Sequence, residues 1–215
     1  MDMTPSKSRR RKPRKKKNNN TKLILSAVAV LVIVTIAIVA YTMLGNNASS
    51  SENVPTNTKV LLETSKGNIT IQLRDDMPIT TGNFKNLVQQ GVYDNTIFHR
   101  VIDGFMIQGG DPTGTGYGDS SIPTIRDEFT DNNKNERSTV AMANTGAPNS
   151  GSSQFFINVV NNSARYSEFD ENYPVFGKVI EGMNVVDDIA KVAVNVTDNY
   201  RPFEEVTLIR ANLID

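Results

Sequence analysis

The stretch FHRVIDGFMIQGGD occupies residues 98–111 and contains His99, the only histidine of the chain, followed directly by Arg100. Its pattern predicts two short strands, at residues 96–102 and 105–108. Taken singly, its side chains have ordinary structural explanations, because an Arg in a strand is usually a surface residue and Phe or Met in a strand is usually part of the core. The importance of the stretch therefore depends on its surroundings.

Short strands continue on both sides of this stretch. Ile69, Ile71 and Leu73 alternate with polar residues, as a half-buried strand requires. The predicted strands lie at residues 60–64, 69–73, 96–102, 105–108, 138–143, 154–159, 175–179 and 205–214, and the predicted helices at 78–90 and 181–191. Many short strands with two helices indicate a mainly β domain, a closed β-barrel capped by two α-helices.

Composition excludes several classes of site. The 215 residues include no cysteine, which rules out disulfides, thiolate nucleophiles and cysteine metal ligands. With one histidine, the chain has no His-rich metal site, and we expect no metal and no cofactor. The net charge of zero conceals an asymmetry, since residues 1–22 hold ten Lys or Arg and one acid. That leaves 13 basic and 22 acidic residues in 23–215, a net charge of −9.

The first 44 residues predict a membrane anchor. Residues 1–22 contain a block of like charges from Arg9 to Lys17 that lacks apolar residues to fold around, which is typical of a disordered tail. Residues 23–44 are uncharged and rich in Leu, Ile, Val and Ala, and 22 residues of helix span a hydrocarbon core of roughly 30 Å. A cleaved signal peptide is the alternative, although its apolar region is usually only about 7–15 residues long. We expect an uncleaved transmembrane signal-anchor helix in contact with membrane lipid.

The basic flank also predicts the orientation of the chain. Positively charged segments next to an anchor stay in the cytoplasm, so residues 45–215 would lie outside it, with the protein in the cell membrane as a single-pass protein. Residues 45–58 are polar and predict a linker, and residues 59–215 form the folded domain.

Three blocks together resemble the cyclophilin family of peptidyl-prolyl cis–trans isomerases. The first is residues 98–111, the second combines MANTG at 142–146 with GSSQFFI at 151–157, and the third is VFGKV at 175–179. The blocks occur in the order and at about the spacing of the family, and the resemblance covers roughly residues 60–214. It implies an eight-stranded antiparallel barrel with a helix over each open end, and an active site in a groove on the outer face of the barrel.

The resemblance also implies functional residues. Arg100 matches the catalytic arginine. The remaining matches form the substrate-binding groove: His99, Phe105, Met106, Gln108, Ala143, Asn144, Gln154, Phe156, Phe169 and Tyr173. Tyr173 stands where some members have His. A rim position that is often aromatic aligns with Glu168, and Tyr166 is the alternative for that place.

These residue types suit the rotation of an Xaa-Pro amide bond. The barrier is the partial double-bond character of the amide, about 18–20 kcal/mol, and the reaction breaks no bond. Uncatalysed exchange takes tens to hundreds of seconds. A site that binds the twisted amide better than either planar form therefore suffices. Arg100 would donate to the prolyl nitrogen, because a guanidinium is always charged and holds its donors in a rigid fork.

Two other functions remain open. The groove could hold proline-containing segments of a partner without turnover, as a membrane-tethered binding module. The basic tail could alternatively bind nucleic acid, but the adjacent apolar segment argues against that function. The leading hypothesis is a rotamase whose partners are proline-containing polypeptides, acting in the folding of secreted or surface proteins, with no nucleic-acid partner.

Overall fold

The computed structural model describes residues 58–166 and 168–214. The predicted tail and anchor, and all of the predicted linker except its last residue, lie outside them. The strands are β1 (Lys59–Thr64), β2 (Gly67–Leu73), β3 (Thr96–Ile97), β4 (Arg100–Ile102), β5 (Met106–Gly109), β6 (Thr139–Met142), β7 (Phe155–Asn158), β8 (Val175–Glu181), β9 (Val194–Asn195), β10 (Arg201–Pro202) and β11 (Thr207–Ile214). The helices are α2 (Pro78–Gln89), α3 (Phe169–Asn172) and α4 (Met183–Ala190).

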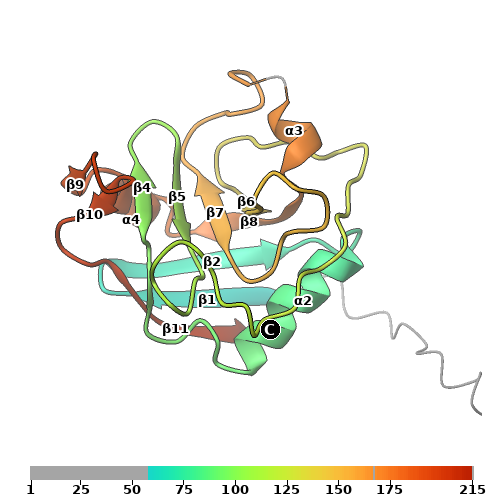
Figure 1. The fold of residues 1–215 in the computed structure, drawn as a ribbon, viewed down its shortest axis with the longest axis horizontal. Helices are drawn as coiled ribbons and strands as arrows, with labels where there is room; N and C mark the ends of the chain where they lie inside the picture. Colours follow the sequence, from blue (N-terminus) through green and yellow to red (C-terminus); the bar gives the residue numbers. More distant parts are fainter. Residues whose placement is uncertain (1–57, 167, 215) are drawn as a thin grey trace, which may run out of the picture. The chain divides into compact units, whose positions relative to one another are not determined.

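Nine of these strands form one curled antiparallel sheet, in the order β3-β11-β1-β2-β8-β6-β7-β5-β4, and β9 and β10 form a separate ribbon. Figure 1 shows α2 at one end of the curled sheet and α4 at the other. The prediction of a mainly β, antiparallel domain with helices is therefore confirmed.

The expectation of a closed eight-stranded barrel is wrong. The nine strands form an open curled sheet, and its two edge strands, β3 and β4, do not pair with each other. The predicted strand 96–102 is broken at Phe98 and His99, so that β3 pairs with β11 while β4 pairs with β5. A continuous strand would have joined both edges. Among the described strands, β3 and β4 are instead joined only through the chain at Phe98 and His99. An isolated bridge between Ile97 and Asp111 connects β3 to the segment that follows β5.

An aromatic cluster attaches α2 to the sheet. The ring of Phe84 lies 5.0 Å from that of Tyr93, 5.4 Å from that of Phe155 and 4.9 Å from that of Phe176, measured between centroids. All four side chains are fully buried. Burying each aromatic ring contributes on the order of 2 kcal/mol or more, so the helix is held mainly by this contact.

The N-terminus of α2 has a cap that the local sequence does not reveal. Pro78 begins the helix, as predicted, but Met77 at the capping position provides no side-chain hydrogen bond. The carboxylate of Glu128 instead accepts hydrogen bonds from the main-chain N–H groups of Ile79 and Thr80, at 3.2 and 2.9 Å. A negative group at this end satisfies free donors and complements the helix dipole.

The second predicted helix begins two residues later than expected because Glu181 belongs to β8. Gly182 separates the two elements with φ +83°, a conformation that L side chains rarely adopt. A Cβ atom there would clash with the carbonyl oxygen of Asn68 and lie 2.9 Å from Cα of Ile69. Glycine is therefore required where β8 turns into α4 against β2.

Three short elements were not predicted: α3, β9 and β10. Each is two to four residues long and lacks a periodic apolar pattern. In the part of the chain that the structure describes, no helix is long and apolar enough to cross a membrane.

Gly182→Ala should lower the free energy of unfolding by about 2 kcal/mol or more, because strain at positive φ adds to the clash with the Asn68 carbonyl. Urea denaturation of both proteins measures the difference. Gly82→Ala is the matched control, since Gly82 lies on the exposed side of α2 and a Cβ atom added there would meet no atom within 4 Å other than the adjoining backbone of its own helix and its chain neighbours. That change should stabilise the helix by about 0.5–1 kcal/mol. Equal changes in the free energy of unfolding for the two substitutions would contradict the requirement for glycine at position 182.

Candidate active site

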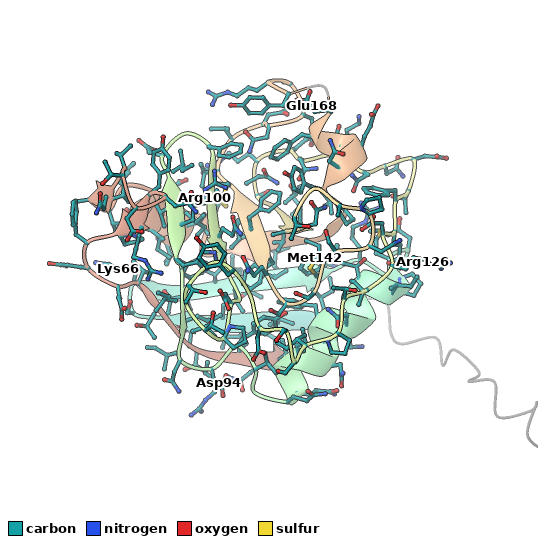
Figure 2. All side chains as sticks on the ribbon, viewed as in Figure 1. Lys66, Asp94, Arg100, Arg126, Met142 and Glu168 are labelled. Carbon is teal, nitrogen blue, oxygen red and sulfur yellow. The ribbon has the colours of Figure 1, made fainter. Side chains whose placement is uncertain are left out.

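The strands that form the core also form the floor of a surface cavity. Val101, Ile107 and Ile157 are buried in the main core, while their neighbours Arg100, Gln108 and Phe156 point to the opposite face. Arg100 pairs with Gln108 across β4 and β5, and Gln108 pairs with Phe156 across β5 and β7. These three residues consequently form one row across three strands. Figure 2 shows Arg100 beside β4 and β5.

The cavity has a volume of about 340 Å³. A second apolar cluster, separate from the main core, consists of Met106, Ala141, Phe156 and Val175, and its members Met106 and Phe156 line the cavity. Aromatic rings form the wall above this floor. The ring of Phe169 lies 5.9 Å from Phe156, 5.6 Å from Phe105 and 4.6 Å from Tyr173. A compact apolar side chain such as the proline ring fits such a pocket.

Arg100 stands at the polar end of the cavity and is only partly exposed. Its Nη1 donates a long hydrogen bond of 3.5 Å to Oε1 of Gln108, and its buried Nε has no partner in the structure. Burial lowers the pKa of Arg100 from its ordinary value, with smaller opposite effects from Tyr173 and Tyr200. The guanidinium thus has donor capacity that a ligand in the cavity can use.

Two glutamines fix the orientation of this polar end. Nε2 of Gln108 donates to Oε1 of Gln154 at 2.8 Å, and Nε2 of Gln154 donates to the carbonyl oxygen of Gly116 at 3.1 Å. The Gln108 carbonyl oxygen therefore faces Arg100.

Gly116 belongs to a loop organised around one buried carboxylate, that of Asp111. The carboxylate accepts hydrogen bonds from the main-chain N–H groups of Thr113, Gly116 and Gly118 at 2.9, 2.7 and 3.1 Å, and from Oγ1 of Thr113 at 2.8 Å. Desolvation raises the pKa of Asp111, but these hydrogen bonds outweigh it and the pKa is lowered overall. The charged Asp111 carboxylate therefore fixes the main chain of Gly116, which lines the cavity.

His99 lies beside Arg100 with only 4% of its surface exposed. Its pKa falls to about 4, chiefly because burial disfavours the charged imidazolium. Arg201 and Arg100 lower it further, while Asp111 and a hydrogen bond with Gln154 act in the opposite direction. His99 is therefore neutral near pH 7, and Arg100 is the cationic side chain that lines the cavity.

The structure brings the sequence-predicted residues together. Ten of them line the cavity: His99, Arg100, Phe105, Met106, Gln108, Ala143, Asn144, Phe156, Phe169 and Tyr173. Gln154 adjoins them through Gln108. Their catalytic and binding roles stay predictions, since position alone does not test them.

Two lining residues, Gly116 and Asn199, were missed. Gly116 has φ +86° in the glycine-rich run 114–118, a turn signal that the sequence contains. Asn199, at φ +48°, lies between β9 and β10, which show no strand pattern. Its place in the cavity depends on how this ribbon docks.

Tyr166 places a further aromatic ring beside the wall of the cavity but, like Glu168, is not among the residues that line it. Its ring lies 5.7 Å from Phe105 and 5.6 Å from Phe169, and it is 42% exposed. Glu168 is exposed, precedes α3 and is not among the lining residues, as its position in Figure 2 illustrates.

A larger cleft, of about 540 Å³, lies between α2 and the loop around Pro123, and side-chain amides of α2 contribute to its lining. Asp119 is its only titratable lining residue, so it offers little chemistry compared with the Arg100 cavity. Within residues 58–166 and 168–214, no group of three or more His, Asp or Glu residues could hold a metal ion.

Comparison with known proteins agrees with this geometry. A family model described as "Cyclophilin type peptidyl-prolyl cis-trans isomerase/CLD" matches residues 59–213. Peptidyl-prolyl cis-trans isomerase A of Dickeya dadantii is 42% identical over 153 residues, which are 70% of this chain and 79% of that protein. A peptidyl-prolyl cis-trans isomerase of Acinetobacter baylyi is 47% identical over 138 residues, which are 63% of this chain and 73% of that protein.

Solved structures show the same fold. The crystal structure of a Cryptosporidium parvum cyclophilin type peptidyl-prolyl cis-trans isomerase superimposes with a TM-score of 0.67 at 30% identity, covering 74% of this chain and 98% of that one. A crystal structure of that protein in the presence of the dipeptide Ala-Pro gives a TM-score of 0.66 at 31% identity. With its matched sequence, its curled sheet and its arginine-lined cavity, this chain belongs to the cyclophilin-type peptidyl-prolyl cis–trans isomerases and has their enzymatic activity, EC 5.2.1.8.

Proposed function

We propose that Arg100 catalyses the isomerisation by donating a hydrogen bond to the prolyl nitrogen of a twisted Xaa-Pro amide. The observation that carries this proposal is the state of its guanidinium, which has a buried Nε without a partner and only a long bond from Nη1. In the twisted amide the nitrogen becomes pyramidal and gains a lone pair. A donor aimed at that nitrogen stabilises the transition state and neither planar form.

The rest of the cavity has complementary tasks in this proposal. Met106, Phe156 and Phe169 hold the proline ring in an apolar pocket, so that one side of the amide is fixed. Gln108 and Asn144 bind the peptide main chain near the polar end. Shortening the exchange from about 100 seconds to milliseconds requires roughly 10⁵-fold, or about 7 kcal/mol. Orientation and one charge-assisted hydrogen bond are effects of suitable size.

The substrates in this proposal are proline-containing polypeptides outside the cytoplasm, such as secreted or surface proteins that are folding. The support comes from the sequence: the basic residues 1–22 flank the apolar residues 23–44, and a basic flank stays on the cytoplasmic side. The solved relative crystallised in the presence of Ala-Pro supports the choice of a proline-containing ligand.

Arg100→Ala should lower kcat/KM on a proline-containing peptide by on the order of 10²–10³-fold, because the transition state loses its charged donor. The kcat/KM of Arg100→Lys should lie between those of the wild type and Arg100→Ala, since an ammonium keeps the charge and lacks the rigid fork of donors. The measurement is NMR exchange with the full-length chain in mild detergent, which needs no coupling protease. Arg210→Ala is the control, because Arg210 is an exposed residue of β11 that does not line the cavity. A folded Arg100→Ala protein with wild-type exchange rates would leave a binding module as the better description.

Acidification should destabilise the protein through His99. The pKa of His99 is about 4 in the folded state and about 6.5 when unfolded, so the unfolded chain takes up the proton first as the pH falls. The contribution of neutral His99 to the free energy of unfolding is complete above pH 6.5. It is lost progressively as the pH falls to 4, and the total loss is roughly 3 kcal/mol. Because His99 is the only histidine, its proton NMR titration is unambiguous. In urea denaturation, the free energy of unfolding of the wild type should fall from pH 6.5 to pH 4 relative to that of His99→Gln, which has no imidazole to protonate. A pKa near 6.5 for His99 in the folded protein would contradict the expectation.

Protease added to intact cells that produce the full chain should digest residues 59–215 and spare an epitope at the N-terminus. The reason is that the basic tail is retained in the cytoplasm while the domain lies outside. Immunoblotting of both ends measures the result, and detergent-permeabilised cells, in which both are digested, are the control. Protection of the domain in intact cells would refute the proposed orientation.

A further inference from the structure

Four buried asparagines lie behind the aromatic wall of the cavity. Asn135, Asn158 and Asn162 are fully buried and Asn133 is 5% exposed. None of them lines the cavity. Burying so many side-chain amides is costly unless each is hydrogen-bonded, so their partners show what the cluster does.

One end of the cluster holds the wall formed by Phe105. Nδ2 of Asn162 donates to the main-chain carbonyl oxygen of Phe105 at 3.0 Å and to Oδ1 of Asn158 at 2.7 Å. Phe105 lies in the turn between β4 and β5 and is only partly buried by its neighbours. Its main chain is therefore held from behind by a side chain of another segment.

The other end holds the short helix α3 and the residue after it. Nδ2 of Asn135 donates to the carbonyl oxygens of Phe169 and Tyr173 at 3.3 and 3.0 Å. Asn133 also donates to Tyr173 O, at 3.0 Å, and accepts from the N–H of Val175 at 2.7 Å. A helix of four residues has little stability of its own, so these bonds contribute to fixing where Phe169 and Tyr173 lie. The carboxylate of Asp170 adds to them, since it accepts from the main-chain N–H of Asn135 at 2.8 Å and from Oγ of Ser163 at 2.6 Å.

Asn158 joins the two ends. Its Nδ2 donates to Oδ1 of Asn135 at 3.1 Å and to Oγ1 of Thr139 at 2.9 Å, while its Oδ1 accepts from Asn162. The path from Phe105 to Tyr173 is thus an unbroken chain of side-chain amides. Both sides of the aromatic pocket are tied to one buried residue of β7, the strand that also carries Phe156.

We propose that Asn135, Asn158 and Asn162 are positioning residues that set the width of the proline pocket. Each of the three aromatic side chains on the wall has its main-chain carbonyl bound by one of these amides, so the network fixes the distance between the Phe105 side and the α3 side. Linked hydrogen bonds support one another in a low-dielectric interior, and a break at one end loosens the other. The proposal rests on the proposed function of the cavity as the substrate site.

The test compares Asn135→Ala, Asn162→Ala and the double variant in the full-length protein, at a temperature where all are folded. Each single variant should raise KM for a proline-containing peptide by about tenfold and lower kcat by less, because the pocket loses its shape while Arg100 stays in place. The double variant should stay within about twofold of the larger single effect, since one break already uncouples the walls. Asn135→Ser and Asn162→Ser replace any alanine variant that fails to fold.

Thr64→Val is the matched control. It removes another nearly buried hydrogen bond to a main-chain carbonyl, from Oγ1 of Thr64 to Gly67 O at 2.6 Å, in a hairpin that does not line the cavity. It should destabilise the fold and leave kcat and KM unchanged. A ¹³C-methyl NMR signal from Met106, on the pocket floor, should shift in both asparagine variants and not in the control.

The proposal is overturned if the folded asparagine variants keep KM within twofold of wild type, or if the double variant shows the full hundredfold product. Arg100→Ala, measured in the same assay, separates the two levels of the argument. If that variant keeps its activity, the proposed function has failed, whereas an inactive Arg100→Ala beside unaffected asparagine variants refutes the positioning role alone.

Discussion

Alternation along β4, β5 and β7 is the constraint on which both the fold and the site depend. Each strand sends one set of side chains, including Val101, Ile107 and Ile157, into the core and the intervening set, including Arg100, into the cavity. A register slip of one residue would exchange the two sets, placing the guanidinium in the core and an aliphatic side chain in the site. Core packing therefore aligns Arg100, Gln108 and Phe156 along the cavity as a direct consequence of folding.

The cavity combines two environments that differ in their demands. Its apolar end is held by aromatic contacts and by the separate cluster around Met106 and Phe156. Its polar end keeps one cation partly desolvated, which lowers the pKa of Arg100 and strengthens its interaction with any acceptor that enters. His99 contributes by staying neutral, because a second positive charge beside Arg100 would repel it.

Much of the fold could be predicted from local pattern. The helix expected at residues 78–90 is observed as Pro78–Gln89, since proline at its start and apolar residues on one face are signals within the segment itself. The strand with clear alternation, β2, lies within two residues of its predicted bounds, and so does the apolar run that forms β1. Eight of the cavity residues were found within three sequence blocks whose order, spacing and residue types all agree, although each residue alone has an ordinary structural explanation. Phe169 and Tyr173 lie between the second and third blocks and came from the same family resemblance.

The sequence by itself thus determined most of the strands and the two longer helices, because these follow from local periodicity, and its resemblance to the cyclophilin family pointed to ten of the residues that line the cavity, Arg100 included. Only the tertiary structure decided that the sheet is curled and breaks at Phe98 and His99, that Glu128 caps α2 from 49 residues away, and that Asn199 reaches the cavity. It also decided the asparagine network, whose bond from Asn162 to Phe105 O joins residues 57 positions apart. Such contacts leave no local signal, since each depends on two segments that folding brings together.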